Sequence, residues 1–435
     1  MTTQLNERLR GLAEDAPASL SPTGLWREGR RRHRRNLVTA FAVVAFVVVG
    51  GAVTGAGSWR STQPGPAVPP AARTGVMPIP DRLFNPSPWL PATSAPGRLV
   101  ALLSSTRDHF PFGSDRNALV GVAAGSQTYR FLDLPGQSPD ASDAYLSPDG
   151  RHVAYWVSGA PTGSANLGAR SLSGFAVLDL TSGVVERHVV PSVHGLAPQS
   201  LTWVDPDTVV LVTDHLTSRE PSSYAGRTKA YVFTVGHDGR SVLRHGDALD
   251  IPVTSTGGYA AMAGSRRLRP YDARTDAPRP EITLSAPLKS VGYDARLGLV
   301  AGTRGYVDAS GPASGRLMVG HVRKGRVHLH AVPGGRRYDQ ALTWVDRRHV
   351  ATLRQTRQGM VYDLVDVRTG SRRQLTSKPW YAFEVARDAL RHARTVPGIA
   401  PPRPWNPRWI ALGGLLAVAC LGAVAVLGRR RHGGP

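Results

Sequence analysis

The stretch LSPDGRHVAYW, residues 146–156, contains a tight turn followed by a strand. Pro148 fixes φ near the value that the second turn position needs, Asp149 can bond to backbone two residues further on, and Gly150 adopts positive φ without steric cost. Apolar side chains then fill both sides of the alternation over residues 153–157, which predicts a strand covered on both faces. One such unit cannot bury itself, so we expect further copies.

Two segments of this unit recur. DGRHVA at 149–154 returns as DRRHVA at 346–351, and LTWVD occurs at 201–205 and at 342–346. A second recurring element is a strand that ends in a short turn, with copies around Asp133, Asp179, Val235, Asp272, His321 and Asp366. The mean spacing of these copies is about 47 residues, a length that is typical of a propeller blade when each unit contains several strands. We interpret Asp133, Asp179 and Asp366 as structural caps of the turns that follow them.

The turn and its strand also carry a resemblance. The turn consists of Ser147, Pro148, Asp149 and Gly150, and VAY follows at 153–155. This combination resembles the repeat of TolB-like and WD-repeat-like β-propellers. Asp205 and Asp346 occupy the corresponding turns of two copies that lack the glycine. The resemblance covers about residues 80–395 and implies an all-β domain, a β-propeller of six or seven blades. It implies nothing about a ligand, because propellers carry many functions.

Two uncharged apolar runs flank this region, Leu37–Ala56 and Trp409–Gly428. Each has 20 residues, enough for a helix that crosses a bilayer core of about 30 Å. Both have arginine clusters on their outer flanks, which predicts cytoplasmic termini and an extracytoplasmic midsection at the cell membrane. A cleaved signal peptide is the alternative for the first run, although that run exceeds the length of a signal core. Trp405 and Trp409 lie where an interfacial aromatic belt is expected.

These features predict seven segments. They are a cytosolic tail at 1–35, a transmembrane helix at 36–57, a proline-rich linker at 58–80, a propeller at 81–396, a second linker at 397–408, a second transmembrane helix at 409–428 and a basic cytosolic tail at 429–435. We expect a strand at Tyr381–Val385 to complete the first blade and close the ring, which removes an exposed sheet edge. The single cysteine, Cys420, can form no disulfide within the chain.

The formal net charge of +22 is distributed along the whole chain. Of the 53 basic and 31 acidic residues, the two tails hold 11 and 4, so about +15 remains on the rest. A basic extracytoplasmic domain meets anionic wall polymers or lipid rather than nucleic acid, although arginine on solvated faces would give the same balance. We expect membrane lipid as one partner, and an anionic cell-wall polymer or a protein as another.

The sequence contains few signs of catalysis. His328 and His330 resemble a metal pair on one strand face, but a third ligand is missing nearby, and G-x-S-x-G is absent. We therefore assign no catalytic, cofactor-binding or metal residues and expect no cofactor. The longest polar insertion, Thr213–Thr228, is the candidate ligand rim, since propeller insertions often build the binding face. Its candidate residues are Asp214, His215, Arg219 and Tyr224.

Three functions remain open at this point. The first is a non-catalytic recognition, scaffold or sensor module that is anchored to the membrane. The second is a propeller hydrolase or lyase that acts on cell-wall polysaccharide, with paired carboxylates brought together only by the fold. The third is control of a cytosolic sigma factor through residues 1–35, because the layout is similar to that of membrane-anchored anti-sigma factors. The tail lacks the HxxxCxxC zinc signature and is shorter than such a domain.

Overall fold

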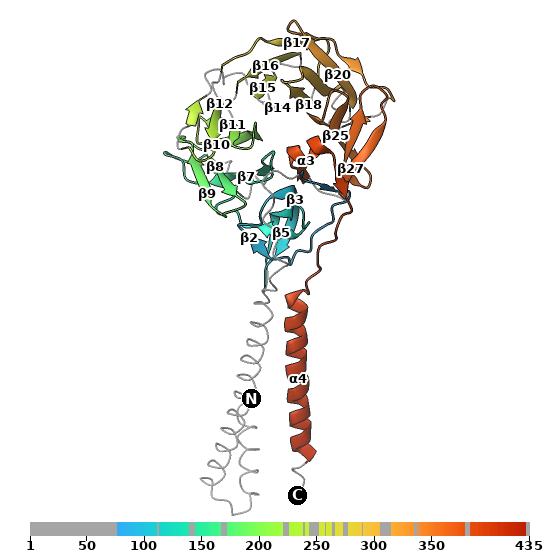
Figure 1. Ribbon diagram of the computed structural model, residues 1–435. Helices are drawn as coiled ribbons and strands as arrows, with labels where there is room; N and C mark the ends of the chain where they lie inside the picture. The colour runs from blue at the N-terminus through green and yellow to red at the C-terminus, as the bar shows by residue number, and fades with distance from the viewer. Residues whose placement is uncertain are drawn as a thin grey trace, which may run out of the picture. The chain divides into compact units, whose positions relative to one another are not determined.

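The computed structural model shows a chain with two compact units, Pro69–Ile410 and a second unit made of Met1–Val68 and Ala411–Pro435 (Figure 1). It describes residues 76–110, 113–138, 144–166, 172–220, 226–237, 240–242, 252–256, 258–262, 266–272, 277–288, 290–304, 315–334, 337–338, 340–378 and 383–431. The predicted N-terminal tail, the first apolar run and most of the first linker lie outside these residues.

The first sheet has five strands and contains both ends of the ring. Its order is β2-β5-β4-β3-β28. The bounds are β2 Ala92–Thr93, β3 Leu99–Asp108, β4 Ser114–Ala123, β5 Tyr129–Leu132 and β28 Phe383–Val385. Strand β28 pairs antiparallel with β3, with Glu384 opposite Leu102. This pairing confirms the closing strand that the sequence predicts within residues 381–385.

The next sheet along the chain has eight strands and contains the stretch that opens the sequence analysis. Its order is β13-β12-β11-β10-β8-β7-β6, and β9 pairs with β8. The bounds are β6 Ala144–Leu146, β7 His152–Ser158, β8 Leu172–Asp179, β9 Val185–Val189, β10 Leu196–Trp203, β11 Thr208–Leu216, β12 Gly226–Thr234 and β13 Arg240–Val242. Strand β7 is buried from Val153 to Val157, as expected for a strand covered on both faces.

The ten-stranded sheet follows with the order β19-β18-β14-β15-β16-β17-β21-β20-β22, and β23 pairs with β20. Its bounds are β14 Pro252–Thr256, β15 Gly258–Met262, β16 Arg267–Tyr271, β17 Ile282–Leu284, β18 Ser290–Asp294, β19 Leu299–Arg304, β20 Gly315–Arg323, β21 Arg326–Val327, β22 His330–Ala331 and β23 Arg337–Tyr338. His328 and His330 therefore do not share one strand, because β21 ends before His328 and β22 begins at His330.

A four-stranded antiparallel sheet, β24-β25-β26-β27, ends the series. Its bounds are β24 Gln340–Trp344, β25 His349–Thr356, β26 Gly359–Asp366 and β27 Arg372–Lys378. The short strands β1 Ile79–Pro80 and β29 Thr395–Val396 pair in parallel, so the segment that enters the domain lies beside the segment that leaves it.

The sheets surround a common centre, so the fold is all-β and propeller-like (Figure 1). Strands β28, β6, β10, β14, β18 and β24 contact one another in that order at the centre. One backbone hydrogen bond also recurs within the sheets. A residue near the end of one strand, or just after it, donates its N–H to the carbonyl of the residue that precedes the neighbouring strand. Its five copies join Ala124 to Arg98, Leu180 to Arg151, Val235 to Asp207, Val322 to Gly298 and Val367 to Arg348, with N···O distances of 2.7–2.9 Å.

This recurring bond tests the positions of the predicted copies. Residues 179, 235, 321 and 366 all lie within one residue of a donor, and Asp272 directly follows β16. At Asp133 a strand, β5, ends before a short turn as predicted, but the recurring bond lies one strand earlier, at Ala124 after β4, so this copy is not equivalent to the others. Both strands end in apolar residues before a turn, so an alternating pattern cannot distinguish neighbouring strands of one sheet.

Two helices complete the described residues. Helix α3, Arg387–His392, directly follows β28 and buries Ala389 and Leu390. It ends at Ala393, which has left-handed backbone angles of φ 48° and ψ 25°. Helix α4 spans Pro407–Arg431. Among the residues that the structure describes, no helix is both long and apolar enough to cross a membrane.

Candidate functional site

The turn at 147–150 is held by its own side chains. Gly150 has φ +74° and donates its N–H to the Ser147 carbonyl at 2.9 Å. The Ser147 hydroxyl donates to Asp149 Oδ1 at 2.7 Å and accepts the N–H groups of Arg151 and His152 at 3.0 and 2.9 Å. The side chains of Ser147 and Asp149 therefore bond within the turn, which gives this motif a structural role.

The same turn also joins neighbouring elements. The Gly150 carbonyl accepts the Leu99 N–H of β3 at 2.8 Å, and the Pro148 carbonyl accepts the Asp388 N–H of α3 at 2.9 Å. A Cβ atom on Gly150 would lie 2.0 Å from the Leu99 carbonyl oxygen. The glycine is thus required both by its backbone angle and by the approach of the first sheet.

The related turns at Asp205 and Asp346 use a carboxylate instead of a serine hydroxyl. Asp205 Oδ1 accepts the Asp207 N–H at 2.9 Å. Asp346 Oδ1 accepts the N–H groups of Arg348 and His349 at 2.6 and 2.8 Å. Burial opposes ionisation of Asp346, but these bonds and the His349 side chain outweigh it and lower the pKa of the carboxyl group.

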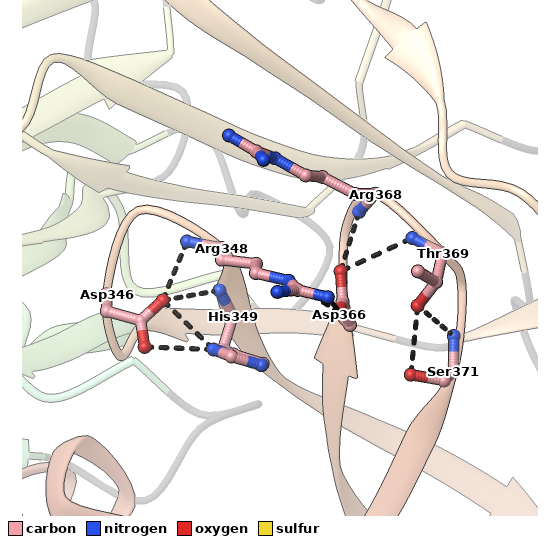
Figure 2. Close-up of polar contacts among 7 residues, drawn as sticks. All are labelled: Asp346, Arg348, His349, Asp366, Arg368, Thr369 and Ser371. Atoms are coloured by element: carbon pink, nitrogen blue, oxygen red, sulfur yellow. Dashed lines mark hydrogen bonds and ion pairs between the residues drawn. The ribbon is translucent and has the colours of Figure 1, made fainter.

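A second carboxylate, Asp366 at the end of β26, links this turn to the next (Figure 2). Its Oδ2 accepts two hydrogen bonds from the Arg348 guanidinium, at 2.6 and 2.7 Å. Its Oδ1 accepts the N–H groups of Arg368 and Thr369 at 2.9 and 3.3 Å. The Arg348 guanidinium holds the pKa of Asp366 well below its usual range.

Asp179 at the end of β8 is capped in the same way, since its Oδ1 accepts the N–H groups of Thr181 and Ser182. The interpretation of Asp179 and Asp366 as turn caps is confirmed. His152 and Asp179 are opposite each other in β7 and β8, and His349 and Asp366 are opposite each other in β25 and β26. The two copies thus place their aspartates in the same register.

Two of the candidate rim residues lie in a strand. Asp214 and His215 belong to β11, because β11 extends to Leu216 and β12 begins at Gly226. Asp214 accepts hydrogen bonds from Gln199 Nε2 and Thr228 Oγ1, both at 2.6 Å, and His215 Nε2 lies 2.7 Å from the Tyr231 hydroxyl. Arg219 is exposed in the connection between the strands, and Tyr224 lies outside the described residues.

This connection is fixed by a residue that the sequence did not single out. The buried Asn166, between β7 and β8, donates from Nδ2 to the carbonyls of Ser218 and Glu220, both at 2.9 Å. Its backbone N–H donates to the His194 carbonyl at 3.0 Å. The β7–β8, β9–β10 and β11–β12 connections are therefore joined to one another through Asn166. An isolated asparagine in a polar loop gives no sequence signal for such a role.

The centre of the ring holds a second group that sequence reasoning missed. Glu384 of β28 accepts the Leu146 N–H of β6 at 2.8 Å, and burial raises the pKa of its carboxyl group to about 7. Arg387, the first residue of α3, donates to the Trp203 carbonyl of β10 at 3.2 Å, and burial lowers the pKa of its guanidinium to about 10. The two charged groups thus join the first sheet to β6 and β10.

Among the residues that the structure describes, no three histidine, cysteine, aspartate or glutamate side chains gather as metal ligands would. Cys420 is a free, exposed cysteine.

Comparisons of sequence find no matching protein-family model and no matching curated protein. Comparisons of structure find solved proteins that are similar to part of this chain. TolB from Acinetobacter baumannii has a TM-score of 0.40 and 13% identity, over 68% of this chain and 67% of TolB. A candidate 6-phosphogluconolactonase from Bacteroides uniformis ATCC 8492 has a TM-score of 0.36 and 13% identity, over 65% and 84%.

A third similar structure comes from a study of two prolyl endopeptidases. It has a TM-score of 0.39 and 15% identity, and the match covers 66% of this chain and 43% of the endopeptidase. All three likenesses are at low identity and concern the fold alone. They do not indicate a substrate or an activity for this chain.

Proposed function

We propose that this chain is a membrane-anchored, extracytoplasmic β-propeller that works as a non-catalytic recognition, scaffold or sensor module. The observation that carries this proposal is that the charged side chains at the centre are hydrogen-bonded to the backbone of neighbouring strands. Glu384 and Arg387 are bound to backbone atoms of β6 and β10, so they hold strands together instead of presenting reactive groups to a substrate. Charged groups that are committed in this way are typical of a rigid platform.

The proposed propeller has six blades. Each blade would begin with one of the central strands β28, β6, β10, β14, β18 and β24, followed outward by the strands that pair with it. The first blade would take its central strand from the end of the domain and the rest from the beginning, through the β28–β3 pairing. Such closure by both chain ends removes the exposed edge that an open series of sheets would have.

The proposed address is the cell membrane, with both termini cytoplasmic. Support comes from the two uncharged 20-residue runs and their arginine clusters at 30–35 and 429–431. The described part of α4 adds exposed apolar side chains, namely Trp409, Ile410, Leu412, Leu415, Leu416 and Leu421. The basic balance of the midsection favours an anionic cell-wall polymer as a partner.

An enzyme that cleaves cell-wall polysaccharide is the second candidate function. The observation that favours it is the carboxyl group of Glu384, whose pKa of about 7 suits a general acid near neutral pH. New reducing ends that appear with the wild-type chain but not with Glu384→Gln would support this candidate and contradict the non-catalytic one. The sigma-factor hypothesis depends on residues 1–35, and a pull-down of cytosolic protein by that tail tests it.

The address is tested by cysteine labelling of intact cells. In a Cys420→Ala background, single cysteines replace Arg31, Arg430 and the exposed Val184. A membrane-impermeant maleimide should label only the cysteine at position 184, and all three after the membrane is permeabilised. Labelling at 31 or 430 in intact cells would overturn the proposed topology, because these positions would then be outside.

A further inference from the structure

Exposed aromatic side chains gather where the domain leads into α4. Trp405 is 82% exposed and Trp409 is 67% exposed, in the segment that leads into α4 and in its first turn. Phe110, in the turn between β3 and β4, is 54% exposed. We call Phe110, Trp405, Trp409 and Ile410 the aromatic edge. Large apolar side chains that cluster on a surface mark an interaction site more often than scattered ones do.

One arginine fastens the two parts of this edge to each other. Arg408 Nη2 donates to the carbonyls of His109 and Gly113, at 3.3 and 3.4 Å. These carbonyls flank the turn that carries Phe110, and the His109 N–H closes the turn on the Gly113 carbonyl at 3.1 Å. The guanidinium also lies over the Trp89 ring, 5.2 Å from its centroid. Phe110 is therefore held beside the first turn of α4, although the two are about 300 residues apart.

The start of α4 is itself set by local bonds. Asn406 accepts the Arg408 N–H through Oδ1 at 2.9 Å and the Trp409 N–H through its carbonyl at 3.0 Å. These bonds are those of a helix N-cap, so the first turn is ordered where the aromatic edge begins. The position of Trp409 relative to the β3–β4 turn is thus defined by Asn406 and Arg408 together.

The chemistry of this edge fits lipid. Residues 397–410 contain Arg403 and Arg408 and no acidic residue, which suits anionic headgroups. Tryptophan is the residue that favours the boundary between headgroups and acyl chains. Trp409 also begins the uncharged apolar run to Gly428, so the edge is continuous in sequence with the proposed anchor.

We propose that the β3–β4 turn enters the bilayer interface beside the start of α4, with lipid as the partner of the aromatic edge. This inference rests on the proposed membrane anchoring. Phe110 takes part in the contact directly, and Arg408 is the positioning residue that keeps the turn at that depth. The first sheet is thereby joined to the membrane at a second point besides the anchor.

The test uses the full chain in vesicles of phosphatidylcholine and phosphatidylglycerol. In a Cys420→Ala background, an environment-sensitive fluorophore is attached to Phe110→Cys, or to Val184→Cys as a matched exposed control. We expect lipids with a quencher near the headgroup to quench the label at position 110 at least about twofold more than the label at 184. Arg408→Gln should reduce quenching at 110 towards the control value, while the chain still floats with the vesicles.

The outcomes separate this inference from the proposal on which it rests. If the chain floats with the vesicles but positions 110 and 184 are quenched equally, the lipid contact is wrong and the anchoring stands. If the lipid quencher does not affect the label at position 110, but an added protein changes the fluorescence of that label, the aromatic edge binds protein and the inference is likewise overturned. If the chain does not float, the anchoring itself is wrong.

Discussion

Gly150 meets two separate requirements in the turn that opens the first clean repeat. Its φ of +74° lies in the left-handed region, and the Leu99 carbonyl oxygen occupies the space where a side chain would begin. The first requirement can be recognised in the sequence SPDG, because turn chemistry is local. The second cannot, because Leu99 belongs to another sheet and lies about 50 residues away.

Gly150→Ala should therefore cost more stability than an alanine at a turn glycine in open space. Gly125→Ala is the matched control, since Gly125 has φ +85° and nothing within 4 Å of an added Cβ. We expect about 1 kcal/mol for the control and about 2–4 kcal/mol for Gly150→Ala, measured by urea denaturation. Equal losses would contradict a role for the Leu99 contact.

Between elements, the last and first sheets of the series are joined by a buried lysine. Lys378 of β27 is 1% exposed, and its ammonium group donates to the Ser104 carbonyl of β3 at 3.3 Å. Burial lowers the pKa of this lysine to about 8. A lysine at the end of a strand reads as a solvated residue in the sequence, so its burial is a property of the packing between two sheets.

This pKa gives a prediction with a definite sign. Between about pH 8 and pH 10.5 the unfolded chain binds more protons at Lys378 than the folded chain does, so the contribution of this group to stability rises with pH in that window. Lys378→Met should remove a rise of up to about 3 kcal/mol, measured as urea midpoints against pH. Lys229→Met, at an exposed lysine on β12, should leave the pH profile unchanged. A wild-type profile in Lys378→Met would count against the buried ammonium.

At the scale of the whole molecule, the ring depends on β28. This three-residue strand pairs with β3, and α3 follows it to meet the turn at Pro148 and the end of β10. The single cysteine is free, so the two chain ends are held without a disulfide. Closure must then come from packing and hydrogen bonds alone.

Val385→Asp tests that closure. Val385 is 4% exposed on β28, whereas Val189 on β9 is 62% exposed and supplies the same substitution at a surface. An unpaired charge in the buried position should cost about 3–5 kcal/mol, while Val189→Asp should change stability by less than about 0.5 kcal/mol. Thermal unfolding followed by circular dichroism measures both. Similar melting temperatures for the two variants would mean that β28 does not hold the ring.

The positions of the strands were largely predictable from the sequence. Which strands pair with each other was predictable only in part. Repeats around Asp179, Val235 and Asp366 align with the recurring backbone bond, because turn residues and apolar alternation are local signals. The copy at Asp133 was misplaced by one strand, because neighbouring strands of one sheet have the same alternation. His328 and His330 were placed on one strand, because two-residue strands such as β21 and β22 leave no pattern.

By itself, the sequence determined the repeating turn and strand units, the presence of a strand within residues 381–385, and the aspartates that cap turns. All of these depend on residues that are near each other in the chain. Only the tertiary structure decided that Glu384 and Arg387 meet backbone atoms at the centre, and that Asn166 and Arg408 tie distant loops together. These contacts join segments separated by about 50 to 300 residues, and such proximity is created when the sheets pack, so no local pattern contains it.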